Sequence, residues 1–143
     1  MKRTEILLVE DDPSDIALTL HAFKMANIAT NIHVVRDGVE ALERIFGNGT
    51  DIPPQIPQIV LLDLKLPRLD GHEVLRRLKD DPRTRAIPVI VLTSSAEERD
   101  VMQTYKVGVN SYIVKPIDFD TFTEAVRDIG KYWLEINHAP ALD

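Results

Sequence analysis

The 143-residue sequence contains no cysteine, and this absence excludes several kinds of chemistry at once. A chain without thiols has no disulfide framework, no thiol nucleophile and no zinc–thiolate site. Long apolar runs are missing as well. The run that follows the charged N-terminus is too short for the hydrophobic part of a secretion signal, and no later run could cross a bilayer. We therefore expect a cytoplasmic protein.

Clusters of basic residues are also absent. The chain has 17 Lys and Arg against 23 Asp and Glu, and its formal net charge is -6. Nucleic acids and anionic membrane surfaces attract positive charge, so neither is expected as a partner.

Five short apolar runs, rich in Val, Ile and Leu, alternate with segments of helical period. The runs cover residues 6–9, 32–35, 59–62, 88–92 and 111–114. This alternation is typical of a parallel sheet with helices on both faces, and it predicts an α/β fold with a doubly wound five-stranded parallel sheet and five helices. The length allows one domain, 1–143, and leaves no room for a second folded domain.

Polar side chains stand where four of these runs end. Glu10 and Asp11 follow the first run, Asp63 the third and Lys115 the fifth, while Thr93 closes the fourth. The carboxyl ends of parallel strands share one edge of the sheet, where ligands bind. Together the five side chains offer a carboxylate nucleophile, acids for a magnesium-like cation, a hydroxyl and an ammonium. This set suits a transferring phosphoryl group, because phosphoryl transfer needs mainly positioning and charge neutralisation.

The first predicted helix has a conventional beginning. Asp12 followed by Pro13 reads as an N-cap and a proline at the first helical position, and Asp15 as an acid favoured by the helix dipole. Residues 47–58, with three prolines and two glycines, predict a long connection without helix or strand. This connection is either a solvated loop or an arm that binds a partner.

The segments LLVEDD, LLDLKLPRLDG, LTS and SYIVKP occur in this order, each at a predicted strand end. With them the chain resembles the receiver domain of two-component response regulators over nearly its whole length. The resemblance implies a flavodoxin-like sheet with strand order 2-1-3-4-5. It also implies that Asp63 accepts a phosphoryl group from a histidine kinase. We expect a phosphoprotein that is not an enzyme, has no output domain and signals by protein–protein contact.

The resemblance also implies a metal site. Asp11 and Asp63 would hold Mg2+, with the backbone carbonyl of Lys65 as third protein ligand and Glu10 acting through water. Mn2+ or Ca2+ could take the place of Mg2+.

The remaining roles concern the response to phosphate. Lys115 would pair with the phosphoryl oxygens, Thr93 would move to bind them, and Tyr112 would follow inward as the aromatic switch. The family pattern further implies a cis peptide bond between Lys115 and Pro116. Lys65 and Ser95 occupy positions at which the family tunes the lifetime of the acyl phosphate.

A narrower resemblance concerns the partner. The long proline-bearing loop, the segments LPRLDG and DDPRTRAIPVIVLTSS and an extended last helix are similar to single-domain regulators of bacterial and cyanobacterial phytochromes. The expected kinase is therefore a phytochrome.

The last predicted helix, about 118–137, has a heptad-like apolar stripe. Twenty helical residues would measure roughly 30 Å, more than strands of about 17 to 20 Å require. The overhanging end carries Tyr132, Trp133 and Ile136, which predicts a homodimer through this helix and the fifth strand. The alternative is that the helix frays after Gly130 and Trp133 folds back on the domain.

Two other functions fit parts of the pattern. A phosphorylation-independent interaction module could share the receiver fold, although all five active-site positions carry competent residues. A phosphatase of the haloacid dehalogenase type also uses an Asp nucleophile, but it has a second Asp two residues later, where this chain has Lys65.

Overall fold

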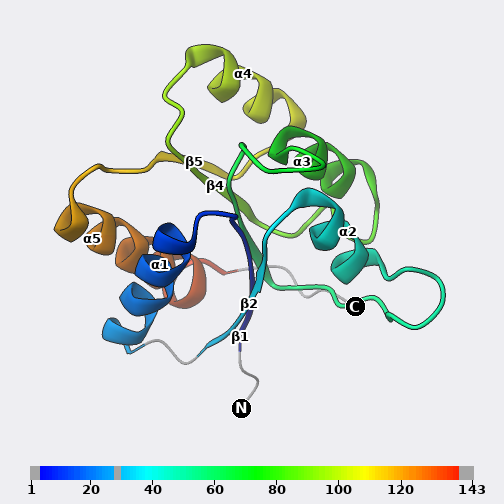
Figure 1. Ribbon diagram of the computed structural model, residues 1–143, viewed down its shortest axis with the longest axis horizontal. Coiled ribbons are helices and arrows are strands. Elements are labelled where there is room, and N and C mark those ends of the chain that lie inside the picture. The colour runs from blue at the N-terminus through cyan, green and yellow to red at the C-terminus, as the bar shows by residue number, and fades with distance from the viewer. Residues whose placement is uncertain (1–3, 28–29, 139–143) are drawn as a thin grey trace.

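The structure is a computed structural model that describes residues 4–27 and 30–138. At its centre is a parallel sheet in the order β2-β1-β3-β4-β5 (Figure 1). The strands are β1 Thr4–Val9, β2 Thr30–Val35, β3 Ile59–Leu62, β4 Val89–Thr93 and β5 Ser111–Val114. This order confirms the predicted fold class and topology.

Helices cover both faces of the sheet, as Figure 1 shows. The helices are α1 Pro13–Met25, α2 Gly38–Phe46, α3 Gly71–Asp80, α4 Glu98–Val107 and α5 Phe119–Gly130, followed directly by the π-helical η1 Lys131–Ile136. α1 packs beside α5 on one face, while α2 packs beside α3, and α3 beside α4, on the other. The carboxyl ends of the strands therefore lie at one edge between the two helical layers.

The sheet separates two apolar clusters, which explains why the central runs show no alternation of apolar and polar residues. In β3, Val60 and Leu62 join the cluster under α2 and α3, whereas Ile59 and Leu61 join the cluster under α1 and α5. Successive side chains of a strand point to opposite faces, so a strand covered on both sides must be apolar throughout. Burying each such side chain contributes about 1.5–3 kcal/mol.

Four helices begin at an Asp whose side chain accepts a backbone N–H of the first turn: Asp12, Asp37, Asp70 and Asp118. The first of these, Asp12, is the N-cap predicted from the sequence. α4 differs, because its N-cap Glu97 makes no side-chain capping hydrogen bond.

The last helix extends almost as far as predicted, but it changes from α to π geometry after Gly130. Trp133 is half-buried against the cluster under α1 and α5, so its predicted exposure in an overhang is wrong. The wider π turn rotates the side chains that follow it around the helix axis. Tyr132 and Ile136 stay exposed, at 48% and 61%. The helix therefore does not fray after Gly130, but Trp133 does pack on the domain, as the alternative expected.

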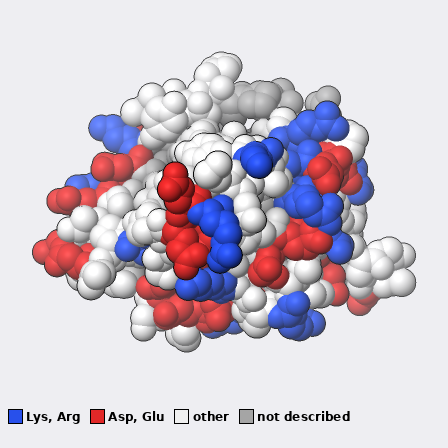
Figure 2. Space-filling model, turned by 90° about the horizontal axis from the view of Figure 1, so that it is seen from above, with Lys and Arg blue, Asp and Glu red and all other residues white. Residues whose placement is uncertain are grey.

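Residues 47–58 form neither helix nor strand, as predicted. The loop is fastened at its end, where the N–H of Gln55 donates to the Arg44 carbonyl and that of Gln58 to the Glu5 carbonyl. On the face in Figure 2, basic side chains lie among acidic ones rather than forming a continuous basic surface. None of the helices in the described ranges is long and apolar enough to span a membrane.

Candidate functional site

The acidic residues predicted to share one edge of the sheet do meet there. Glu10, Asp11 and Asp63 each offer a carboxylate oxygen within 4.8 Å of the others. Glu10 and Asp63 are buried, at 3% and 8% exposure, whereas Asp11 is exposed. The cluster is therefore a largely buried pair of acids with a third at its solvent side.

Backbone hydrogen bonds fix these positions just beyond the strands. The N–H of Asp63 donates to the Val9 carbonyl at 3.0 Å, and that of Lys115 donates to the Thr93 carbonyl at 2.7 Å. Gly71 packs directly against the backbone that carries Asp63. A Cβ at this position would collide with the Asp63 carbonyl oxygen and the Leu64 Cα. Only glycine lets α3 begin so close to the backbone of the central acid.

Lys115 is the cation of the site, and its side chain is only 9% exposed. Its Nζ donates to Glu10 Oε2 and Asp15 Oδ2, both at 2.7 Å, and to Asp63 Oδ2 at 3.3 Å. Asp15 is the site residue that the sequence analysis missed, since the helix dipole alone explained it. A usable signal exists: α1 starts at the carboxyl end of β1, so an acid in its first turn lies at the same edge.

Burial and neighbouring charge shift the proton equilibria of this cluster. Burial first, and then the charge of Asp63, raise the pKa of Glu10 to about 7, against the opposing effect of the Lys115 ammonium. Burial would lower the pKa of Lys115, but the hydrogen bonds that it donates to Asp15 and Glu10, together with the Asp63 charge, outweigh burial and raise that pKa. Lys115 thus stays charged, while the acids around it outnumber it.

This donor set suits a divalent cation. The groups are carboxylate oxygens only, which favours Mg2+, Mn2+ or Ca2+ over metals that prefer nitrogen or sulfur. Burial is the main cause of the raised pKa of Glu10, and repulsion by the like charge of Asp63 adds to it; a cation would relieve this repulsion. The backbone of Lys65 lies beside the cluster, since its N–H donates to Asp63 Oδ1 at 3.3 Å.

Thr93 and Tyr112 each form a hydrogen bond with Ser95. Thr93 is fully buried, and its Oγ1 accepts a long hydrogen bond of 3.4 Å from the Ser95 N–H. The Tyr112 ring packs partly buried against the cluster under α2 and α3, and its hydroxyl donates to the Ser95 carbonyl at 2.8 Å. The predicted hydroxyl and the predicted aromatic switch therefore share one loop residue.

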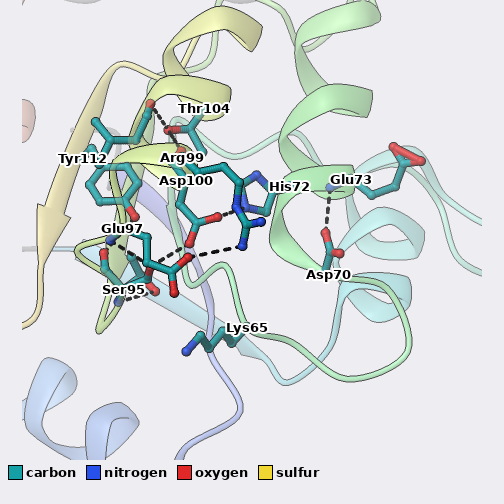
Figure 3. Close-up of polar contacts among 12 residues, drawn as sticks. Lys65, Asp70, His72, Glu73, Ser95, Glu97, Arg99, Asp100, Thr104 and Tyr112 are labelled. Carbon is teal, nitrogen blue, oxygen red and sulfur yellow. Dashed lines mark hydrogen bonds and ion pairs between the residues drawn. The ribbon is translucent and has the colours of Figure 1, made fainter.

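From Ser95 the contacts continue to two helices, as Figure 3 shows. The Ser95 hydroxyl donates to Asp100 Oδ2 at 2.6 Å, and Asp100 Oδ1 lies 3.1 Å from His72 Nε2. Asp100 is in the first turn of α4 and His72 in the first turn of α3. The sequence analysis identified neither residue, because pairs this far apart in the chain depend on how the helices pack.

The peptide bond between Lys115 and Pro116 is trans, because no cis bond occurs in the described residues. The cis bond implied by the family pattern is therefore wrong for this structure. The trans form is also the form that an X–Pro bond ordinarily favours.

Comparisons with known proteins agree with this site. Residues 6–127 match the response regulator receiver domain. The probable methanogenesis regulatory protein FilR2 of Methanothrix harundinacea is 42% identical over 138 residues, 94% of this chain and 86% of FilR2. The response regulator Rcp1 of Synechocystis sp. is 38% identical over 136 residues, 95% of this chain and 92% of Rcp1.

Solved structures give the same result. The phosphorylated cyanobacterial phytochrome response regulator RcpA has a TM-score of 0.92 at 36% identity, covering 98% of this chain and 100% of that one. The Mn2+-bound form of Rcp1 has a TM-score of 0.89 at 37% identity, covering 96% and 99%. The chain therefore belongs to the response regulator receiver domain family.

Proposed function

We propose that this protein is the phosphoacceptor of a two-component relay and that the Asp63 carboxylate receives the phosphoryl group from a histidine kinase. The observation that carries the proposal is the contact of Asp63 with the buried Lys115 ammonium, 3.3 Å apart, inside a cluster of acids. An ammonium that stays charged supports transfer of a negative group to a carboxylate, which would otherwise be repelled.

In the transfer, an Asp63 oxygen forms a bond to phosphorus as the bond between phosphorus and the kinase imidazole breaks, and the imidazole nitrogen keeps the electron pair. Lys115 balances the charge on the phosphoryl oxygens, and the Thr93 hydroxyl donates to one of them. The chain modifies itself rather than a separate substrate, so it takes part in phosphotransfer without being an enzyme in the usual sense.

A divalent cation would belong to this reaction. Asp11 and Asp63, the Lys65 carbonyl, and Glu10 through water would hold Mg2+, with Mn2+ or Ca2+ as substitutes. The cation would supply charge neutralisation at the phosphoryl oxygens. The Mn2+-bound Rcp1 structure supports this set by similarity, and the three carboxylates within 4.8 Å support it directly.

Ser95 would pass the conformational change caused by phosphorylation from the site to the protein surface. A phosphoryl group on Asp63 would draw Thr93 toward it and compete with the 3.4 Å contact between Thr93 and Ser95. Tyr112 is held by the same Ser95 and packs against the cluster under α2 and α3, so the two residues would shift together and change the α4 and α5 surface. Phosphorylation would then favour one of two pre-existing arrangements.

A phytochrome is the kinase that the narrower similarity favours, because RcpA is described as a phytochrome response regulator. The sensor must bring its phosphohistidine to Asp63 and therefore cover the rim of the site. Next to Lys115 this rim exposes Val114, Ile117 and Phe119, with Ile117 fully exposed. An apolar rim of this kind suits a protein partner in the cytoplasm.

A homodimer through the last helix and β5 is part of the same proposal. β5 is an edge strand that pairs on one side only, with β4. Tyr132 and Ile136 are exposed apolar side chains on the last helix, at 48% and 61%. Open strand edges and apolar helix surfaces are both ordinary components of interfaces.

Intact mass after incubation with acetyl phosphate and Mg2+ tests the acceptor. We expect a gain of one phosphate, about 80 Da, in the wild type and none in Asp63→Asn. A sample with EDTA serves as the metal-free control. If neither acetyl phosphate nor a phosphorylated histidine kinase adds this mass, the chain is a phosphorylation-independent interaction module and the proposal is wrong.

A further inference from the structure

Asp15 makes a side-chain contact in the site that its favourable position in the helix dipole does not require. It lies in the first turn of α1, where its backbone N–H contacts Asp12 Oδ1 at 3.3 Å and its carbonyl accepts from Thr19 Oγ1 at 2.7 Å. These contacts hold the residue in place through its backbone. Its carboxylate is therefore available to accept a hydrogen bond from the Lys115 Nζ, at 2.7 Å, and the side chain is only 24% exposed.

The three contacts of Lys115 account for the whole donor capacity of its ammonium, which has three protons. One is directed to Asp15, one to Glu10 and one, the longest contact, to Asp63. Asp15 is the only one of the three acids that lies outside the acidic cluster with Asp11. The Lys115 N–H that donates to Asp15 therefore points away from the cluster.

A cation and an ammonium compete for the same carboxylates. Glu10 and Asp63 face each other and Lys115, and both belong to the group of acids suited to a divalent cation. Like charges in one pocket repel strongly when they are shielded from water. The closer the Lys115 ammonium settles on these two acids, the less favourable a divalent cation becomes beside it.

We propose that Asp15 is a positioning residue that holds the Lys115 ammonium on the α1 side of the site and thereby strengthens binding of the divalent cation. Without Asp15, the Lys115 N–H that donated to it loses its acceptor. The ammonium then moves toward Glu10 and Asp63, and the 3.3 Å contact to Asp63 shortens. Burial disfavours the charged ammonium, and Asp15 is among the groups that keep it protonated. The inference rests on the metal set of the proposed function.

The test is the Mg2+ dissociation constant, measured by amide chemical shifts during titration with MgCl2 at 0.15 M salt. We expect Asp15→Asn to weaken Mg2+ binding roughly tenfold, the scale of losing one hydrogen bond between charged groups. The matched control is Asp12→Ser, which removes a neighbouring carboxylate that does not contact Lys115 and keeps an N-cap residue. Its dissociation constant should stay within about twofold, since exposed charges are screened.

A double-mutant cycle separates this role from plain attraction between Asp15 and the cation. In a Lys115→Gln background, Asp15→Asn should change the Mg2+ dissociation constant by about twofold or less, because no ammonium remains to position. An equal loss in both backgrounds, or a loss with Asp12→Ser as large as with Asp15→Asn, overturns the inference. If Lys115→Gln does not fold, the comparison with Asp12→Ser still decides.

The same samples keep the two proposals apart. If the wild type binds Mg2+ and Asp63 gains phosphate, but Asp15→Asn binds Mg2+ as tightly as the wild type, only the role of Asp15 is wrong. If the wild type binds no Mg2+, the proposed metal set is wrong and the role of Asp15 falls with it.

Discussion

Glu10 should make the metal-free protein less stable as the pH rises toward neutrality. Burial raises its pKa from 4.5 to about 7, so the folded state binds a proton more tightly than the unfolded state does. The resulting stability is fully present below pH 4.5 and is lost as the pH rises through 7. At 1.36 kcal/mol per pKa unit, the loss amounts to roughly 3 kcal/mol of unfolding free energy.

Urea denaturation in EDTA between pH 5 and pH 7.5 measures this loss. The relevant quantity is the difference in unfolding free energy between the wild type and Glu10→Gln, because other titrating groups cancel in it. We expect the difference to fall by roughly 2–3 kcal/mol across the range. Glu5→Gln is the matched control, since the pKa of Glu5 is lowered, first by its hydrogen bond from Asn31, and its difference should stay flat.

A flat difference for Glu10→Gln would show that Glu10 is already ionised in the folded protein and would refute the account of the buried acid pair. Saturating Mg2+ offers a second check. A cation favours the ionised carboxylate, so the wild-type loss between pH 5 and 7.5 should shrink or disappear when MgCl2 replaces EDTA. A wild-type slope that does not respond to Mg2+ would contradict a cation site at Glu10.

Two further outcomes are expected. Gly71→Ala should destabilise the fold by about 1–3 kcal/mol and slow phosphorylation by acetyl phosphate, because its Cβ would displace the Asp63 backbone. Gly49→Ala is strained by the φ of +81° at that position, but its Cβ meets no atom and it lies in the 47–58 loop, so phosphorylation should be unchanged. Solution mass should show a wild-type dimer and a monomer for the double variant Tyr132→Ser and Ile136→Ser, with Met25→Ser on α1 remaining dimeric; a monomeric wild type contradicts the proposed interface.

The sheet and the edge that carries the site follow from the sequence because local rules determine them. Strands buried on both faces must be continuously apolar, so the polar residue that ends each run marks the edge of the sheet. Asp63 and Lys115 are predictable in this way without knowledge of any contact. The strand order is less local, and it came from the resemblance of the motifs rather than from the period of the runs.

The change of helix type after Gly130 and the start of α4 could not be read in the same way. Fraying after Gly130 is one of the two outcomes that the sequence allows, but Trp133 packs against the α1 and α5 side of the core and the helix continues, in π geometry. Glu97 caps α4 without a side-chain hydrogen bond, so the strong local signal that identifies the other helix starts is missing there.

Local sequence rules do not predict which residues the site residues contact. Lys115 lies within hydrogen-bonding distance of three acids that are 52, 100 and 105 residues away in the chain. Four acids follow the first strand within six residues, and only the direction in which α1 leaves the sheet makes Asp15 a partner of Lys115 and Asp12 a helix cap. Residue type and spacing therefore predict which groups gather at the edge, whereas the division of one ammonium among them depends on helix packing. That division determines how much negative charge is left for a cation, so the tuning of the site is a property of the folded arrangement.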